Sequence, residues 1–422
     1  MRIQLVSLKD SFFKSMSILA SGSIISQIIT VITAPILTRL FSVEEIGIYT
    51  YIVSIATLFM STINLRYDMA IVSEEDEKNI YPLIKLCLLI GGILSVIISI
   101  GYIFYLNFVK VEYKQYTFSA VFIFMLLNSY MIINILNAYN TRKEEYKIMT
   151  TMYLVRTSCQ NFGGIFFGLF NVGIIGLLLP YTIGQVLGIK KQMSSLKNHI
   201  HDIIGANRRQ VVSLAKKHYK QVVYSTPALF ANSFSYNSIT LFIEMLFGMS
   251  VVGLYSISVR ILGIPLSVIS GNVSKVFFQQ ASLEFRKTGA YRKTYIKSFM
   301  FLLVISIPMT IGMIMLGPWV CKTFFGDEWI IAGEYIRILA PMFGVRFIAT
   351  ALSPGLIISR KQNYELWIQI LLLLTSVVSF LIALLMSISI EHFLQIVCIS
   401  KAIVYLLLIV VVFYCSTIGK KE

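Results

Sequence analysis

Continuously apolar runs of about twenty residues recur from one end of this chain to the other. Each run is long enough to cross the hydrocarbon core of a bilayer, which is roughly 30 Å thick. Because lipid offers no hydrogen-bond partners to the backbone, such runs cross it as α-helices. Only 13% of the residues are charged, about half of the fraction in an ordinary soluble domain. The sequence therefore predicts an all-α polytopic membrane protein.

The apolar runs predict about twelve transmembrane helices, separated by polar connections. The first run follows basic residues, as in a signal peptide, but it continues without a clear cleavage site and is expected to be retained as a span. The predicted spans are 16–38, 46–65, 82–106, 117–140, 148–170, 172–190, 223–247, 251–274, 296–316, 333–358, 364–387 and 393–417.

The positive charges predict the orientation of these spans. Most of the 36 lysines and arginines fall in every second connection, including both chain ends. Basic connections stay in the cytoplasm, so both termini are expected there and the number of spans is expected to be even. The net charge of +16 then reflects topology, and no nucleic-acid partner is expected. The terminal basic residues are Arg2, Lys9, Lys14, Lys420 and Lys421, and the alternate connections contain only Arg39, Lys110, Lys114 and Lys322.

An internal repeat is visible at a constant offset along the chain. The segment LFSVEEIGIYTYIVSI (40–55) matches LFGMSVVGLYSISVRI (246–261), including the pair Gly47 and Gly253. An even number of spans separates the two segments, which predicts a parallel repeat; in transporters such repeats place a substrate path between the halves. The expected domains are bundles of about six helices each, over 1–192 and 223–422, joined by a basic cytoplasmic connection over 193–222.

Three stretches carry a resemblance to a known family. They are the first span with its Pro35, the segment TRLFSVEEIGIYTYIVSI (38–55) and the segment LRYDMAIVSEEDE (65–77). They resemble polysaccharide flippases of the Wzx type, in the multidrug/oligosaccharidyl-lipid/polysaccharide (MOP) exporter superfamily. The resemblance implies two six-helix bundles around a central cavity. It also implies translocation of undecaprenyl-pyrophosphate-linked glycans from the cytoplasmic to the outer leaflet of the bacterial plasma membrane, for surface polysaccharides such as O-antigen. Other polysaccharide-assembly membrane proteins are then possible partners.

Cationic residues inside the predicted spans point to an anionic ligand. A central arginine or lysine costs about 2.5–3.5 kcal/mol to insert, and Glu244 is the only plainly intramembrane acid. A pyrophosphate fits as the counter-charge, because a cation–anion pair at about 4 Å is worth roughly 4 kcal/mol at an effective dielectric near 20. Arg337 lies near a span end, where snorkelling explains it. The predicted substrate-binding residues are Arg260, Arg346, Arg156, Lys401 and, at the inner end of the second span, Arg66.

The neighbours of Arg260 favour a polar cavity. Small and hydroxyl residues recur at alternating spacings of three and four on its helix, which places them on one face. Small residues also permit close helix packing, so the stripe alone leaves both interpretations open. An arginine inside it favours the cavity. The stripe comprises Ser256, Arg260, Gly263, Ser267, Ser270 and Ser274.

Other residues carry weaker expectations. Asp68 and Glu244 are the candidates for coupling transport to a proton or sodium gradient, and no bound cofactor is expected. Pro35 and Pro265 are candidate hinges, since proline interrupts the helical hydrogen bonds. An Arg66–Asp68 pair at a cavity mouth and a snorkelling helix end remain open alternatives. The acidic run at 74–78 is expected to be a solvated loop, and no Cys or His spacing suggests a metal.

Two other functions fit the sequence less well. A drug exporter of the same superfamily would need buried carboxylates for cationic drugs, whereas the cavity candidates here are mostly basic. A polysaccharide polymerase or glycan transferase would place acids or histidines in a sizeable outer loop. The longest outer connection, 317–334, offers Asp327 and Glu328 but no convergent partner. The sequence therefore favours a transporter over an enzyme.

Overall fold

The computed structural model describes residues 2–417, with side chains for residues 21–417 apart from Gln362. The side chains of Arg2, Lys9 and Lys14, and the whole of Lys420 and Lys421, lie outside the described residues. Within the described part of the chain, all regular secondary structure is helical. This confirms the all-α prediction.

The helices group into two compact units. Unit 1 comprises residues 1–33 and 52–233, and unit 2 comprises residues 34–51 and 234–422. Three helices contribute to both units: α1 (Arg2–Leu40), α2 (Val43–Met60) and α11 (Thr226–Phe247). The basic connection predicted at 193–222 packs within unit 1. The division into bundles over 1–192 and 223–422 remains a prediction about the repeat.

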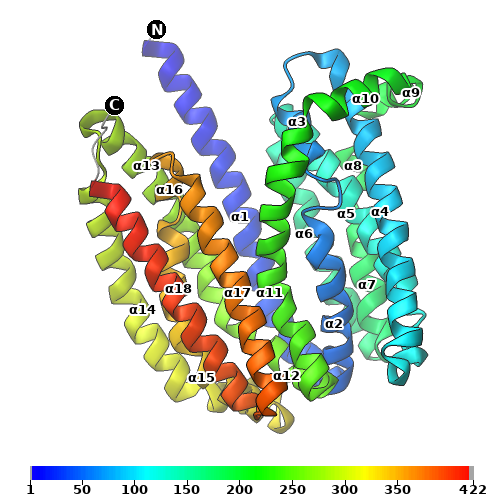
Figure 1. Ribbon diagram of the computed structural model, residues 1–422, viewed down its shortest axis with the longest axis vertical. Helices are drawn as coiled ribbons and strands as arrows, with labels where there is room; N and C mark the ends of the chain where they lie inside the picture. The colour runs from blue at the N-terminus through cyan, green and yellow to red at the C-terminus, as the bar shows by residue number, and fades with distance from the viewer. Residues whose placement is uncertain (1, 418–422) are drawn as a thin grey trace. The chain divides into compact units, whose positions relative to one another are not determined.

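Unit 1 is built around packed long helices (Figure 1). Its core includes Leu126, Tyr130 and Ile133 of α5, which pack with Ala56 of α2. The hydroxyls of Tyr130 and Tyr181 lie 2.6 Å apart. Besides parts of α1, α2 and α11, the helices are α3 (Tyr67–Ser73), α4 (Ile80–Phe108), α5 (Ser119–Arg142), α6 (Tyr146–Gly168), α7 (Ile175–Val186), α8 (Ile189–Gln192), α9 (Ile200–Gly205) and α10 (Arg208–Lys217).

Unit 2 is organised around α15, which packs against α14, α12 and α18 and buries most of its side chains. A helix whose side chains are mostly apolar and buried belongs in a bundle interior. Figure 1 shows α14, α15, α17 and α18 running side by side. The remaining helices are α12 (Met249–Pro265), α13 (Gly271–Thr288), α14 (Arg292–Val320), α15 (Ile330–Leu352), α16 (Gly355–Ile358), α17 (Gln362–Met386) and α18 (Ile390–Thr417).

Nine helical segments of the described chain are long and apolar enough to cross a membrane. The chain is therefore a multi-pass membrane protein, although the count of twelve remains a prediction. The predicted spans outside the nine are 148–170, 172–190 and 223–247. Helices α6 and α11 carry many hydroxyl and amide side chains, which lower their hydropathy, and α7 has only 12 residues.

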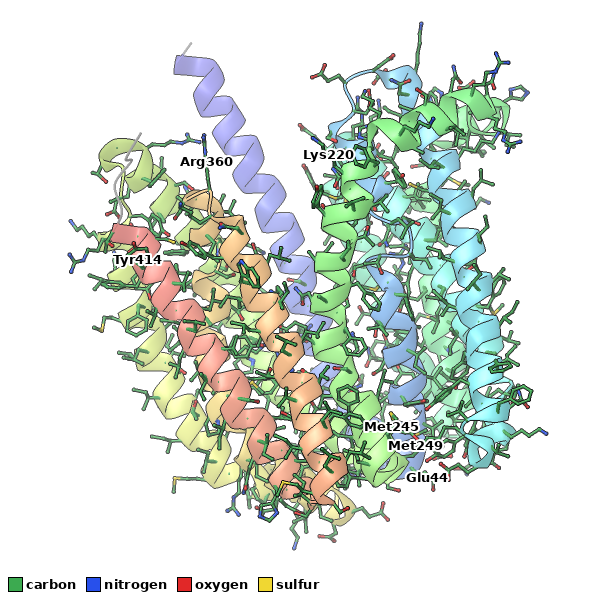
Figure 2. The ribbon with its side chains drawn as sticks, viewed as in Figure 1. Glu44, Lys220, Met245, Met249, Arg360 and Tyr414 are labelled. Atoms are coloured by element: carbon green, nitrogen blue, oxygen red, sulfur yellow. The ribbon has the colours of Figure 1, made fainter. Side chains whose placement is uncertain are left out.

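The two segments of the predicted repeat meet in unit 2. A methyl group added to Gly47 would lie 1.9 Å from the carbonyl oxygen of Met249, and one added to Gly253 would lie 2.0 Å from that of Val43. Gly47 thus faces the backbone of Met249, which lies one helical turn before Gly253. Gly253 in the same way faces the backbone of Val43, one turn before Gly47. In Figure 2 the labels of Met249 and Glu44 lie next to each other, where α12 and α2 begin. The contact is reciprocal and leaves no room for a side chain at either glycine.

Glu74, directly after α3, binds side chains at the end of α10 in unit 1. Its two carboxylate oxygens each lie 2.8 Å from Lys217 Nζ, and Oε2 lies 2.9 Å from His218 Nε2. Asn79 Nδ2 donates a further hydrogen bond at 3.2 Å. Only 2% of the Glu74 side chain is exposed, so the expectation of a solvated loop at 74–78 is wrong at this residue. Three donors brought together by the fold compensate for its burial.

Candidate functional site

Two of the predicted cations meet around one tyrosine of unit 2. The guanidinium carbon of Arg346, on α15, lies 4.5 Å from the ring centroid of Tyr236 on α11. Lys401 Nζ, on α18, lies 5.8 Å from the same centroid. Both distances lie within the range of cation–π attraction, which stabilises a charge away from water. We call Arg346, Lys401, Tyr236 and Tyr405 the cationic cluster.

Polar atoms complete the cationic cluster. The side chain of Lys401 is buried, and its Nζ donates a hydrogen bond of 2.8 Å to the carbonyl oxygen of Ser235. The hydroxyls of Tyr236 and Tyr405 lie 3.2 Å apart. Arg346 Nε is buried and has no hydrogen-bond partner within the described chain. An unsatisfied buried donor on a charged group is expensive.

The positive charges of this cluster have no carboxylate partner. Within residues 21–417, apart from Gln362, neither Arg346 nor Lys401 forms an ion pair with Asp or Glu. Two like charges near one tyrosine repel each other, and burial adds a desolvation cost. The cluster is consequently suited to a ligand that brings negative charge and oxygen acceptors.

Arg260 is not a member of the cationic cluster, although its helix α12 packs against α15, which carries Arg346. It is half-buried on α12, and the ionisable group that interacts with it is Tyr49 of α2. The structure shows no direct interaction between Arg260 and the cationic cluster. A joint role of Arg260 with Arg346 therefore remains a prediction.

The predicted stripe beside Arg260 does not continue as one face. Pro265 ends α12, and Leu266–Ser270 form a π-helical turn before α13 begins. A π-helical turn holds more residues than an α-helical turn, so side chains beyond it change direction. Ser270 is buried and donates a hydrogen bond of 2.8 Å to the carbonyl oxygen of Phe347. The expectation that Ser270 shares a cavity-lining face with Arg260 is wrong for this reason.

Arg156 lies in unit 1 and is partly hydrogen-bonded there, while its Nε, like that of Arg346, is buried without a partner in the described chain. It is 6% exposed, and its Nη2 donates a hydrogen bond of 2.5 Å to Gln192 Oε1. Gln192 Nε2 in turn donates to Asn137 Oδ1 at 3.2 Å. These bonds tie α6 to α8 and α5, which is a structural role. A role in substrate binding remains a prediction.

Arg66 and Asp68 flank the start of α3. Arg66 has a left-handed backbone with φ of 63° and forms no ion pair with Asp68 within the described residues. Asp68 is buried, and its Oδ1 has no hydrogen-bond partner there. Burial raises the pKa of the Asp68 carboxyl, while Arg66 partly offsets this rise. The neutral form of Asp68 is thus less disfavoured than that of a carboxyl group in water.

The remaining predicted residues are placed as follows. Glu244 is 2% exposed on α11 in unit 2. Pro35 lies inside α1, and Pro265 closes α12 directly before the π-helical turn. Arg337, expected to snorkel, pairs with Glu334 at 2.9 Å on the exposed side of α15. Its charge is locally compensated, in contrast to that of Arg346.

The sequence did not single out the tyrosines. Tyr236 and Tyr405 contribute a ring and two hydroxyls to the cationic cluster, and Tyr255 also interacts electrostatically with Arg346. Tyrosine side chains within apolar helices are a signal that would have identified them, because a buried hydroxyl usually requires a partner. Tyr255 belongs to the repeated segment at 246–261, whose spacing alone did not reveal this role.

The fold is that of a MOP-superfamily transporter. It is similar to the inward closed conformation of the lipid II flippase MurJ, with 13% identity, a TM-score of 0.72, and coverage of 93% of this chain and 87% of that one. A MOP superfamily transporter from Pyrococcus furiosus matches with 12% identity, a TM-score of 0.60 and coverage of 94% of both chains. An outward-facing multidrug resistance MATE transporter matches with 13% identity, a TM-score of 0.60, and coverage of 95% and 94%.

The sequence itself identifies the family. Residues 36–334 match the polysaccharide biosynthesis protein family, and the chain belongs to it. No curated protein sequence matches the chain. Family and fold together confirm the resemblance to polysaccharide flippases of the MOP superfamily. The chain is thus a multi-pass membrane protein of the polysaccharide biosynthesis family, with a fold shared by a flippase and by other membrane transporters.

Proposed function

We propose that this protein moves undecaprenyl-pyrophosphate-linked oligosaccharide units from the cytoplasmic to the outer leaflet of a bacterial plasma membrane, for surface polysaccharide biosynthesis. The observation that carries the proposal is the cationic cluster, in which Arg346 and Lys401 share Tyr236 and have no carboxylate partner among the described side chains. Its occurrence in a polysaccharide biosynthesis family supports an anionic glycan carrier as the cargo.

The pyrophosphate of such a cargo matches the chemistry of the cluster. Arg346 can offer two parallel N–H donors to phosphate oxygens, while Lys401 adds a point charge. Tyr236 and Tyr405 supply hydroxyl groups for further hydrogen bonds. The polyprenyl chain would stay in lipid, where it loses no hydrophobic stabilisation. Movement then requires the protein to shield only the polar part of the cargo.

Drug export is the nearest alternative, because some similar folds are multidrug transporters. A cationic drug would be repelled by Arg346 and Lys401. In the Pyrococcus furiosus transporter, reverse polarity of the binding pocket suggests a different function. The positive cluster of the present chain favours an anionic cargo.

Coupling to an ion gradient forms part of the proposal. Glu244 and Asp68 are buried carboxyl groups that could exchange a proton or bind sodium during transport. We expect Glu244→Gln to reduce the dependence of flipping on a proton or sodium gradient, because the amide cannot ionise. Initial rates with and without each imposed gradient measure this effect. An unchanged response to both gradients would remove Glu244 from the coupling mechanism.

A flipping assay tests the function directly. Proteoliposomes are loaded with a polyprenyl-pyrophosphate oligosaccharide, and the rate at which the glycan reaches the opposite leaflet is measured. We expect Arg346→Gln and Arg260→Gln each to reduce the protein-dependent rate at least about tenfold, since a hydrogen bond to a charged group is worth about 1.5–3 kcal/mol. Arg337→Gln removes the same charge from an exposed ion pair, and we expect it to retain the wild-type rate.

Each outcome of this assay has a distinct meaning. Wild-type flipping that is lost in Arg346→Gln but retained in Arg337→Gln supports both the function and the cationic cluster. Flipping retained by an Arg260→Gln/Arg346→Gln double variant would keep the function and remove both arginines from the site. Absence of flipping, together with export of a small organic cation, would replace the proposal by drug export.

A further inference from the structure

A basic pocket lies in unit 2, between the end of α13 and the short helix α16. Its volume is about 390 Å³. Phe278 and Phe285 of α13 form one apolar wall, and Ile357 and Ile358 of α16 form another. Figure 1 shows these two helices adjacent at one end of the unit. No residue of the cationic cluster lines it, so the two sites are separate.

Two arginines line this pocket without acidic neighbours. They are Arg286, near the end of α13, and Arg360, directly after α16, which Figure 2 labels. Neither forms an ion pair within the described residues, and no Asp or Glu lines the pocket. Glu284, the acid of α13 nearest to Arg286, instead accepts hydrogen bonds from the backbone of Lys293 and Thr294 at 3.1 and 2.8 Å. The pocket therefore keeps a net positive charge.

The walls of the pocket are held in place by a buried tyrosine. Tyr291 is fully buried, and its hydroxyl donates a hydrogen bond of 2.9 Å to the carbonyl oxygen of Gly355 at the start of α16. The same hydroxyl lies 2.9 Å from Ser359 Oγ. Arg360 follows with a left-handed φ of 56°, a backbone state that is uncommon outside glycine. The arginine is thus presented by a fixed turn, which lowers the entropy cost of binding.

Exposed apolar side chains adjoin the two charges. Phe278 is 39% exposed and Ile357 is 48% exposed. This end of the unit belongs to the connections predicted to face the cytoplasm, where arginines meet the lipid headgroups. An anionic head next to an apolar chain is the ligand that this surface matches. Basic pockets between helices on the cytoplasmic side are suited to phosphate headgroups.

We propose that this pocket binds the phosphate headgroup of an anionic glycerophospholipid of the inner leaflet. The phosphate lies between Arg286 and Arg360, and the first part of an acyl chain packs on Phe278 and Ile357. A pocket of this volume suits a ligand of small-molecule size. A phosphoglycerol headgroup meets that limit, whereas a pyrophosphate bearing several sugars exceeds it. The bound lipid bridges α13 and α16.

Native mass spectrometry of the full-length protein in detergent tests this proposal without reference to transport. The probe is phosphatidylglycerol, with zwitterionic phosphatidylcholine as the comparison lipid. We expect wild-type protein to retain one phosphatidylglycerol preferentially and Arg286→Gln/Arg360→Gln to bind it at least about tenfold more weakly. Lys287→Gln/Lys293→Gln removes the same charge from neighbouring residues that do not line the pocket, and we expect it to bind as wild type does.

A second variant separates the pocket from general surface charge. Ser282→Trp keeps both arginines and fills the space beside them, so we expect it also to lose the bound lipid. Equal retention by wild type and the double arginine variant would overturn the proposal. An equal loss in the Lys287→Gln/Lys293→Gln control would overturn it as well, since binding would then reflect surface charge. Displacement by farnesyl diphosphate with no preference for phosphatidylglycerol would reject a phospholipid as the occupant.

Discussion

Buried charges in this chain are stabilised in two different ways. In unit 1, Arg156 donates to Gln192, although its Nε has no partner in the described chain, and the Glu74 carboxylate accepts from Lys217 and other donors. In unit 2, Arg346 and Lys401 face aromatic rings and have no acidic partner in the described chain. Charges satisfied by the protein position its elements, whereas uncompensated charges are available to a ligand.

Glu74 provides a prediction for pH dependence. Burial alone would raise the pKa of its carboxyl, but the hydrogen bonds from Lys217, His218 and Asn79 outweigh this effect and lower the pKa to about 2. A carboxyl with a depressed pKa stabilises the folded state above its unfolded pKa of about 4.5. The stabilisation, on the order of 3 kcal/mol, is lost as the pH falls from about 4.5 towards 2.

We expect Glu74→Gln to loosen α10 at neutral pH and to remove this acid-dependent step. Hydrogen exchange of residues 208–217 measures the loosening, and unfolding between pH 5 and 2.5 measures the pH dependence. Glu75→Gln is the matched control, because Glu75 is exposed and adjacent. Similar exchange of α10 in the two variants would contradict a positioning role for Glu74.

At the scale of elements, two helix features shape unit 2. The α2–α12 contact depends on Gly47 and Gly253, where each backbone fills the space of the other's missing side chain. A π-helical turn separates α12 from α13 and directly follows Pro265. Proline and π-helical turns are both recognised causes of helix kinks. Pro265 is therefore well placed to act as the hinge expected from the sequence, although motion there remains a prediction.

We expect Gly47→Ala and Gly253→Ala to destabilise the protein. The added methyl at either position would lie within 2.0 Å of a backbone carbonyl oxygen, and a backbone cannot move away as a flexible side chain can. Overpacking of this kind typically costs about 1–3 kcal/mol. The melting temperature in detergent measures the effect.

Gly263→Ala is the control on the same helix, since nothing lies within 4 Å of its added methyl. Alanine favours a helix over glycine by about 0.8–1.0 kcal/mol, so we expect this variant to be as stable as wild type or more so. Melting temperatures that fall equally for Gly263→Ala and Gly47→Ala would show that close packing at the α2–α12 contact is not the cause.

At the scale of the whole molecule, the charge bias predicts the orientation in the membrane. The Glu75 connection belongs to the basic set expected inside, and the Glu112 connection to the alternate set expected outside. Both residues are exposed. Of the five native cysteines, Cys159 is half-buried and the others are buried, and all five can be replaced to give a silent background.

We expect a membrane-impermeant maleimide to label Glu112→Cys, but not Glu75→Cys, in intact spheroplasts. Permeabilised spheroplasts should show labelling at both positions, which controls for the reactivity of each cysteine. The opposite pattern would invert the topology, and labelling of both or neither in intact spheroplasts would contradict the predicted alternation of connections between these residues.

The sequence predicted the helical class on physical grounds that act locally, and it predicted the family through the resemblance of a few stretches. Apolar run length and the absence of charge determine which segments enter a bilayer, regardless of tertiary contacts. The same reasoning identified Arg346 and Lys401 as unusual, because the cost of a charge in lipid is a property of the residue and its depth. The three- and four-residue spacing did not predict the helix face correctly beyond Pro265. The π-helical turn there changes the direction in which the side chain of Ser270 points.

The sequence by itself thus determined that this chain spans a membrane and that its helices carry cations without enough acids, and it predicted a repeat of two segments around Gly47 and Gly253. Only the tertiary structure decided that Arg346 and Lys401 share Tyr236, that Glu74 is buried against Lys217, and that the two glycines touch. Insertion into lipid depends on one segment at a time, whereas each of these contacts depends on helix packing between residues far apart in the chain.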